Sequence, residues 1–183
     1  DPFNLKSEHY VFANSNTFVT YLTRLTNNIF SSKEIPSTLS SSIIIPLAKS
    51  YKKSLKDPNN YRGISLTPII TKILELIIVE KCPALKRNNI SQFGFKANSS
   101  TLHAEAILLD TIQYYNSKDT PVYICSLDAE KAFDCCNWLT LFRKLSERDI
   151  PNIVNAFLIK LYLNGSAIIH YSDNYSKTFH LTQ

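Results

Sequence analysis

The sequence predicts a mixed α+β fold. Segments with helical spacing of apolar residues alternate with short apolar runs that are rich in β-branched residues. Most of these short runs come as hairpin pairs and do not alternate singly with helices, as a doubly wound parallel sheet would require. Apolar residues make up 44% of the 183 residues, which suffices for a buried core.

The first quarter of the chain predicts a helix followed by a β-hairpin. Residues 16–30 place apolar side chains at helical spacing, which is typical of an amphipathic helix. A serine-rich loop follows over residues 31–42. Residues 43–47 and 61–66 are β-prone runs, and the lysine-rich connection 49–60 would form the basic tip of the hairpin between them.

Helix start and stop signals follow the hairpin. Thr67 is a capping residue that precedes Pro68, and proline suits the first helical position. This helix should reach about Lys81, because Pro83 cannot continue it. Residues 91–98 are polar and predict a loop.

A second helix and a buried strand are predicted in the middle of the chain. Ser99 or Ser100 can cap a helix that reaches about Tyr115. The side chains expected to face inward on this helix are Leu102, Ala106, Leu109 and Ile112. Residues 121–128 are rich in strand-forming residues and predict a buried strand.

Two further helices and a second hairpin complete the predicted order. Asn137 can cap a helix through Arg148, and Pro151 opens another that reaches Leu163. The closing hairpin would have strands at 167–171 and 178–181, with its turn at 172–176.

Composition disfavours several classes of protein. Three glycines leave little material for a glycine-rich phosphate loop, and the four cysteines show no C-x-x-C spacing for zinc. Unpaired cysteines favour an intracellular protein with reduced thiols. No apolar run approaches the ~18 residues of a membrane helix. The absence of methionine favours an excised piece of a longer chain over removal of the initiator.

Basic residues are concentrated in the middle of the chain. Residues 49–96 hold ten basic and three acidic residues, whereas residues 97–183 hold seven and nine. A basic region followed by an acidic one predicts a surface for a polyanion beside a carboxylate site. A solvated lysine-rich loop is the alternative explanation of the charge.

An aspartate at the end of the predicted strand is the sharpest chemical feature. Asp128 follows the apolar run 122–127, so its carboxylate would be held rigidly at an open sheet edge. Mg²⁺ is bound in this way by one or two carboxylates plus substrate phosphates. Polymerases hold two such ions, and one aspartate cannot hold both. An aspartyl-phosphate enzyme or a helix cap remains the alternative, and Asp134 is more typical of a cap or an ion pair.

Residues 127–134, LDAEKAFD, resemble the L-D-x-x-K-A-F-D signature of reverse transcriptases of non-LTR (LINE-like) retrotransposons. Other segments resemble that family's blocks in the same order, within a resemblance that runs from about residue 16 to the end. They are 44–49 (I-P-x-x-K), 56–66 (D-x-x-x-Y-R-P-I-S-L), 71–75 (T-K-I-L-E) and 91–101 (Q-F-G-F-R…S-T). The sequence departs from the family at Gly63, where the family has proline.

The resemblance implies the fingers and partial palm of a right-hand polymerase. Residues 1–42 would be an N-terminal helical segment, 43–120 a fingers-like region with the basic hairpin and helices, and 121–183 the partial palm. The family's later G-x-x-Q-G block and its strand with two adjacent aspartates are not in this sequence. The palm is therefore expected to be truncated before the second catalytic carboxylate block, and the 183 residues alone are expected to be inactive.

The resemblance also implies roles for residues around the aspartate. Asp128 would be the catalytic metal ligand, with the Ala129 carbonyl as a second metal contact. Lys131 and Ala132 would offer backbone N–H groups to the triphosphate of the incoming nucleotide. Phe133 would be a steric gate that leaves no room for a ribose 2′-OH.

Residues before the aspartate would bind nucleotide and nucleic acid. Lys49 and Arg62 lie on the predicted hairpin, where cations neutralise the triphosphate. A surface ion pair for Arg62 and an ordinary surface lysine for Lys49 are the alternatives. The residues that could line the nucleic-acid path, with loop packing as the alternative, are Gln92, Phe93, Phe95 and Lys96.

The function implied is RNA-directed DNA polymerisation, in which a primer 3′-OH attacks a dNTP. Two Mg²⁺ (or Mn²⁺) ions, an RNA template, a DNA primer and dNTP would take part, with an endonuclease domain elsewhere in the intact polyprotein. A nuclear or a cytoplasmic ribonucleoprotein is equally consistent with the sequence. A non-catalytic transposon relic that at most binds nucleic acid is the alternative, whereas an aspartyl-phosphate enzyme would want a D-x-D-x-T context.

Overall fold

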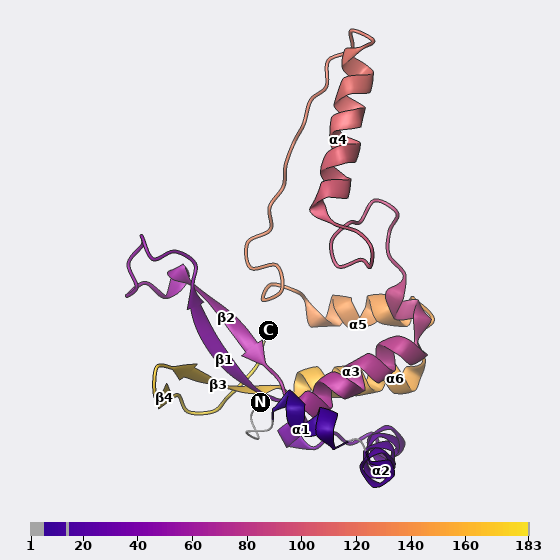
Figure 1. The fold of residues 1–183 in the computed structure, drawn as a ribbon, viewed down its shortest axis with the longest axis vertical. Helices are drawn as coiled ribbons and strands as arrows, with labels where there is room; N and C mark the ends of the chain where they lie inside the picture. Colours follow the sequence, from indigo (N-terminus) through magenta and orange to yellow (C-terminus); the bar gives the residue numbers. More distant parts are fainter. Residues whose placement is uncertain (1–5, 14, 183) are drawn as a thin grey trace. The chain divides into compact units, whose positions relative to one another are not determined.

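The computed structural model describes residues 6–13 and 15–182. The chain divides into two compact units, one made of Asp1–Leu85 with Cys136–Gln183 and the other of Lys86–Cys135. The first unit holds the sheet and most of the helices, and the second holds one long helix and the segment that carries Asp128 (Figure 1).

The first unit is built on a five-stranded mixed sheet, so the predicted α+β class is confirmed. Its strands are β1 (Ser41–Ala48), β2 (Tyr61–Leu66), β3 (Ser166–Tyr171), β4 (Asn174–Tyr175) and β5 (Phe179–His180). The order is β2-β1-β3-β4, and β5 also pairs with β3. The hairpin of β1 and β2 is antiparallel as predicted, whereas the parallel pairing of β1 with β3 was not foreseen.

The predicted closing hairpin forms with one addition. β3 pairs with β5 in antiparallel register, which confirms the two predicted strands. The residues predicted as a plain turn contain β4, which also pairs with β3.

The predicted helices are confirmed, with ends that differ by a few residues. The helices are α1 (Ser7–Phe12), α2 (Asn16–Ser32), α3 (Ile69–Lys81), α4 (Thr101–Asn116), α5 (Trp138–Ser146) and α6 (Asn152–Leu163), and the 3-10 turns are η1 (Ser37–Ser40), η2 (Pro58–Asn60) and η3 (Pro83–Lys86). The Asn137 side chain caps α5 by accepting from the Thr140 N–H at 2.8 Å. The prediction of Thr67 as a cap is wrong, because Pro68 occupies the N-cap of α3 and no side chain caps it.

The core of the first unit lies where α2, α3 and α6 meet. Its buried members are Ile29, Ile35, Leu39, Leu74, Ile78 and Phe157. Burial of each such side chain contributes about 1.5–3 kcal/mol relative to exposure. The Phe30 and Phe157 rings lie 5.2 Å apart. The buried Thr71 hydroxyl donates to the Leu39 carbonyl at 2.7 Å, which ties α3 to the turn before β1.

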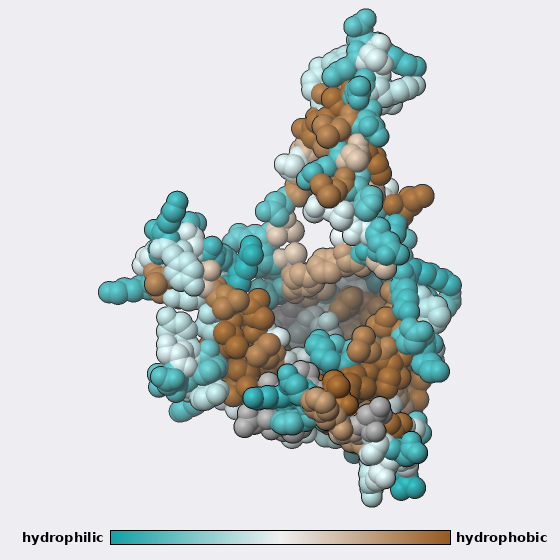
Figure 2. All heavy atoms as spheres, viewed as in Figure 1, coloured by the Kyte–Doolittle hydropathy of each residue, from teal (hydrophilic) through white to brown (hydrophobic). Residues whose placement is uncertain are grey.

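The second unit lacks a closed core in the part that the structure describes. No described side chain between residues 86 and 135 is fully buried. The prediction of an inward face on α4 is therefore wrong, since Leu102 and Leu109 are largely exposed. Figure 2 shows apolar side chains on the surface of this helix. Helical spacing predicts an apolar face, but it does not show which other part of the protein would pack against that face.

The predicted buried strand at 121–128 does not form. Residues 121–129 adopt neither helix nor strand, and Figure 1 draws them as an extended trace. Leu127 is 95% exposed, and Tyr123 is similarly open. A strand needs a neighbour that accepts its backbone hydrogen bonds, and the paired strands of the described residues do not include this segment. The sequence has the apolar composition of a strand, and the described residues lack the partner.

Candidate functional site

Asp128 lies at the end of an extended, exposed segment of the second unit. A turn follows it, and the Cys135 N–H donates to the Lys131 carbonyl at 2.9 Å to close that turn. An exposed aspartate oxygen is a hard ligand that suits Mg²⁺. Within the described residues, no group of three or more His, Cys, Asp or Glu side chains is placed to hold a metal. The described residues thus form no complete metal site around Asp128, and the roles of Asp128 and the Ala129 carbonyl as metal contacts stay predictions.

The turn after Asp128 contains one residue with a left-handed backbone. Lys131 has φ 49°, in the left-handed region. A left-handed residue within a turn can direct successive N–H groups to one side, where they bind anions. In the described part of the chain, the backbone N–H groups of Lys131 and Ala132 donate to no other backbone carbonyl. The predicted contact of these two groups with a triphosphate stays a prediction.

Two sequence blocks of the second unit meet through their aromatic rings. Phe133 and Phe95 lie 5.8 Å apart at 89°, an edge-to-face arrangement. Both rings remain largely exposed on their other sides. The structure therefore places a predicted nucleic-acid-path residue against the predicted steric gate, a contact that spacing alone could not show.

The other predicted residues of the nucleic-acid path shape their own loop. The Gln92 side-chain amide donates to the Gly94 carbonyl at 3.0 Å. Phe93 and Lys96 are half-buried, and Phe95 has φ 56°. These contacts agree with the loop-packing alternative for Gln92, and they leave Phe95 as the exposed aromatic ring of the block.

Lys49 and Arg62 take different positions on the hairpin of the first unit. The Lys49 ammonium donates to the Asn59 carbonyl at 3.0 Å, and its N–H donates to the Asn60 carbonyl at 2.7 Å. Lys49 therefore fastens the two ends of the hairpin connection. Arg62 lies opposite Leu47 on β1 and is exposed, so its guanidinium can reach a ligand.

A buried asparagine that sequence reasoning missed orders the hairpin tip. The Asn60 amide donates to the Ser50 carbonyl at 2.8 Å, while its Oδ1 is buried without a partner. Asp57 accepts from the Asn59 N–H at 2.9 Å and starts the short turn that delivers Asn60. The run D-P-N-N is a turn signal that could have indicated this.

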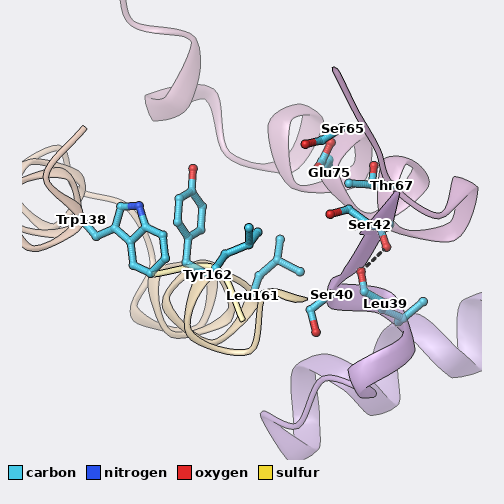
Figure 3. Close-up of a pocket in the computed structure, with 12 residues that line it drawn as sticks. Leu39, Ser40, Ser42, Ser65, Thr67, Glu75, Trp138, Leu161 and Tyr162 are labelled. Carbon is cyan, nitrogen blue, oxygen red and sulfur yellow. Dashed lines mark hydrogen bonds between the residues drawn. The ribbon is translucent and has the colours of Figure 1, made fainter. Parts of the chain in front are cut away.

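A cavity of about 200 Å³ lies beside the core of the first unit (Figure 3). The Trp138 and Tyr162 rings meet edge to face at 5.3 Å on one side of it. Burial, with smaller effects of Cys136 and Glu75, raises the pKa of the Tyr162 hydroxyl. Glu75 lines the cavity and accepts from the Lys72 ammonium at 2.7 Å. None of the residues predicted for catalysis or nucleotide binding lines this cavity.

In the described residues, no helix combines the length and the apolar character that a membrane crossing needs.

Comparison with known proteins identifies the family. No curated protein matches the chain. The family described as reverse transcriptase (RNA-dependent DNA polymerase) matches residues 51–182. This match includes the blocks at 56–66, 91–101 and 127–134 and begins after the block at 44–49. Since it spans more than two-thirds of the sequence, the chain belongs to the reverse transcriptase family.

Proposed function

We propose that the chain supplies the fingers and the first part of the palm of an RNA-directed DNA polymerase of the non-LTR retrotransposon type. The observation that carries the proposal is the LDAEKAFD block, which lies within the family match and puts Asp128 before a turn in which Lys131 has a left-handed backbone. The fingers would run from 43 to 120 and the partial palm from 121 to 183, after an N-terminal helical segment.

The reaction proposed is nucleotidyl transfer to a primer 3′-OH, with pyrophosphate as the leaving group. Divalent ions stabilise the charge on the transferred phosphate when they are bound. Asp128 would hold one such ion, with the Ala129 carbonyl beside it. The N–H groups of Lys131 and Ala132 would bind phosphate oxygens of the nucleotide. Arg62, which is exposed on the first unit, is a second residue whose positive charge would suit a phosphate.

Selection of deoxynucleotides is assigned to Phe133. Its ring is exposed five residues after Asp128, and the Phe95 ring supports it from one side. A bulky ring at the sugar position excludes a 2′-hydroxyl by volume. An aromatic pair also holds its orientation better than a lone exposed ring.

Residues 121–128 would form their predicted strand by pairing with the rest of the palm. The segment is extended and no described strand pairs with it, so a neighbouring strand would bond to its backbone N–H and C=O groups. In the family, a strand with two adjacent aspartates follows further along the chain, and that block is not among these 183 residues. It would supply both the missing partner and the missing carboxylates.

The lysine-rich hairpin tip should make nucleic-acid binding depend on salt. Replacing Lys52 and Lys53 together by alanine should lower the slope of log affinity against log salt by about 1.4, because each phosphate contact on a single strand contributes ~0.7. Fluorescence anisotropy of a labelled single-stranded RNA, measured over a series of salt concentrations, gives this slope.

A matched pair outside the basic region serves as the control. Lys118 and Lys144 are exposed and lie beyond residue 96, so their joint replacement by alanine should leave the slope close to that of the wild type. Binding that does not respond to salt, or equal slopes for the two double variants, would contradict the proposed polyanion surface.

A further inference from the structure

A groove on the first unit lies on the face of the sheet opposite to Arg62. It has a volume of about 450 Å³ and is bordered by β1, β2, β3 and the hairpin connection. Neighbouring residues of a strand point to opposite faces, so Tyr61 and Arg62 lie on different faces of β2. The groove floor includes Ile44, Pro46 and Ile169. This face is therefore separate from the one that presents Arg62.

Two tyrosines from distant parts of the chain form one wall of the groove. The Tyr61 and Tyr171 rings meet edge to face at 6.1 Å and 86°, and their hydroxyls lie 3.4 Å apart. The Tyr61 hydroxyl donates to the Leu55 carbonyl at 2.9 Å, which fixes its ring. The hydrogen bond to Tyr171, followed by desolvation, raises the pKa of the Tyr61 hydroxyl. Tyr171 keeps 53% of its surface exposed and can accept a stacked ring.

The floor is open at Gly63, where the chain departs from its family's sequence pattern. A Cβ at this position would lie 3.0 Å from the Ile44 Cγ2 atom, which is tighter than an ordinary contact. The family's D-x-x-x-Y-R-P-I-S-L block has proline at this position, and the proline ring would occupy the space beside Ile44. Glycine here therefore keeps the groove free for a ligand.

The border of the groove favours a polyanion over a polypeptide of mixed charge. The segment 49–58 contains four lysines and one acidic residue, Asp57, and Lys56 itself lines the groove. Tyr51 in the same segment is 85% exposed. Figure 2 shows hydrophilic side chains at the hairpin tip and apolar ones over its strands. Aromatic rings among cations are the usual platform for single-stranded nucleic acid, whose bases stack while its phosphates pair with lysines.

We propose that this groove binds a base of single-stranded nucleic acid, stacked on Tyr171, with the adjoining phosphates at the lysines of the hairpin tip. The inference rests on the proposed function, because it takes nucleic acid as the substrate. It adds a second binding face to the first unit, on the side of the hairpin away from Arg62.

Removal of the Tyr171 ring tests the groove. Tyr171→Ala should weaken binding of a labelled 12-nucleotide RNA to the 183-residue chain by about 5- to 150-fold, the usual effect of losing one base–aromatic stack. Tyr171→Phe keeps the ring and should bind within about twofold of the wild type. Tyr21 is exposed on α2, away from the groove, so Tyr21→Ala is the matched control and should not change the affinity.

The salt series separates this inference from the proposed function. Tyr171→Ala should lower affinity at every salt concentration while it leaves the salt slope unchanged, because stacking releases no counterions. A chain that binds no RNA at low salt would contradict the proposed function itself. Salt-dependent binding that is unaffected by Tyr171→Ala would overturn the proposed stacking in the groove and would leave the proposed function standing.

A fluorescent variant gives a second readout that does not depend on loss of binding. In Tyr171→Trp an indole replaces the proposed stacking ring, and RNA should quench its emission relative to the wild type, in which Trp138 is the single tryptophan. Binding of RNA without additional quenching in this variant would also overturn the groove.

Discussion

Asp128→Asn should reduce DNA synthesis by about 10²- to 10³-fold when residues 1–183 are joined to the remaining palm of an active member of the family. Asparagine keeps the size of the side chain and one oxygen, but it removes the negative charge that holds a divalent ion. Loss of a single preorganised electrostatic contact costs enzymes a factor of this size. Primer extension with dNTPs and Mg²⁺ measures the rate for both joined chains.

An exposed aspartate of the same unit provides the control for that comparison. Asp110 lies on α4 and is outside every block that the family shares with this chain, so Asp110→Asn should synthesise DNA at the rate of the unchanged joined chain. Equal rates for all three chains would contradict the assignment of the metal to Asp128.

Leu74→Ala should lower the free energy of unfolding by about 2–5 kcal/mol, the usual cost of removing a buried leucine side chain. Leu74 is 1% exposed and packs in the core formed by α2, α3 and α6. The loss combines the apolar surface that is no longer buried with the cavity that remains. Urea unfolding followed by circular dichroism measures the change.

The same helix contains a matched control for the core substitution. Leu76 is two residues away in α3 and is 69% exposed, so Leu76→Ala should change the free energy of unfolding by no more than about 0.5 kcal/mol. Similar losses for the two variants would show that the core is not where the structure places it.

Local signals account for the elements that the sequence predicted correctly. Asn137 caps α5 through its own side chain. The apolar residues of α2 recur at helical spacing within one continuous segment, so the sequence shows this helix directly. The hairpin of β1 and β2 joins residues that are close in the chain. Each of these features depends on neighbours that the sequence shows directly.

Pairings between distant residues explain the failures. β1 pairs with β3 in parallel although more than 100 residues separate them, and no local pattern specifies that register. The segment 121–128 has the composition of a strand, but pairing depends on a neighbour that composition does not show. The prediction that apolar residues of α4 face a core fails in the same way, because an amphipathic pattern does not show which surface packs against the apolar face.

The candidate site also combines residues that the sequence singled out with contacts that only the structure shows. The sequence motif was enough to single out Asp128 and Phe133, because the family's pattern is local. The contact of Phe133 with Phe95, the tie of Lys49 to Asn59 and the pair of Tyr61 with Tyr171 required the structure. The last of these joins residues 110 positions apart, which come near one another because β2 and β3 both pair with β1.

The central claim is that this chain carries part of a site that copies RNA into DNA. The most direct test is primer extension on homopolymeric RNA templates, by the 183 residues alone and by the joined chain once its cooperative unfolding has shown that it is folded. The joined chain should incorporate dTTP on poly(rA) and dGTP on poly(rC), and the 183 residues alone should incorporate neither. A folded joined chain that makes no DNA, or that adds nucleotides without regard to the template, would contradict the claim. Synthesis by the 183 residues alone that Asp128→Asn abolishes would instead show that the carboxylates beyond Asp128 are not required.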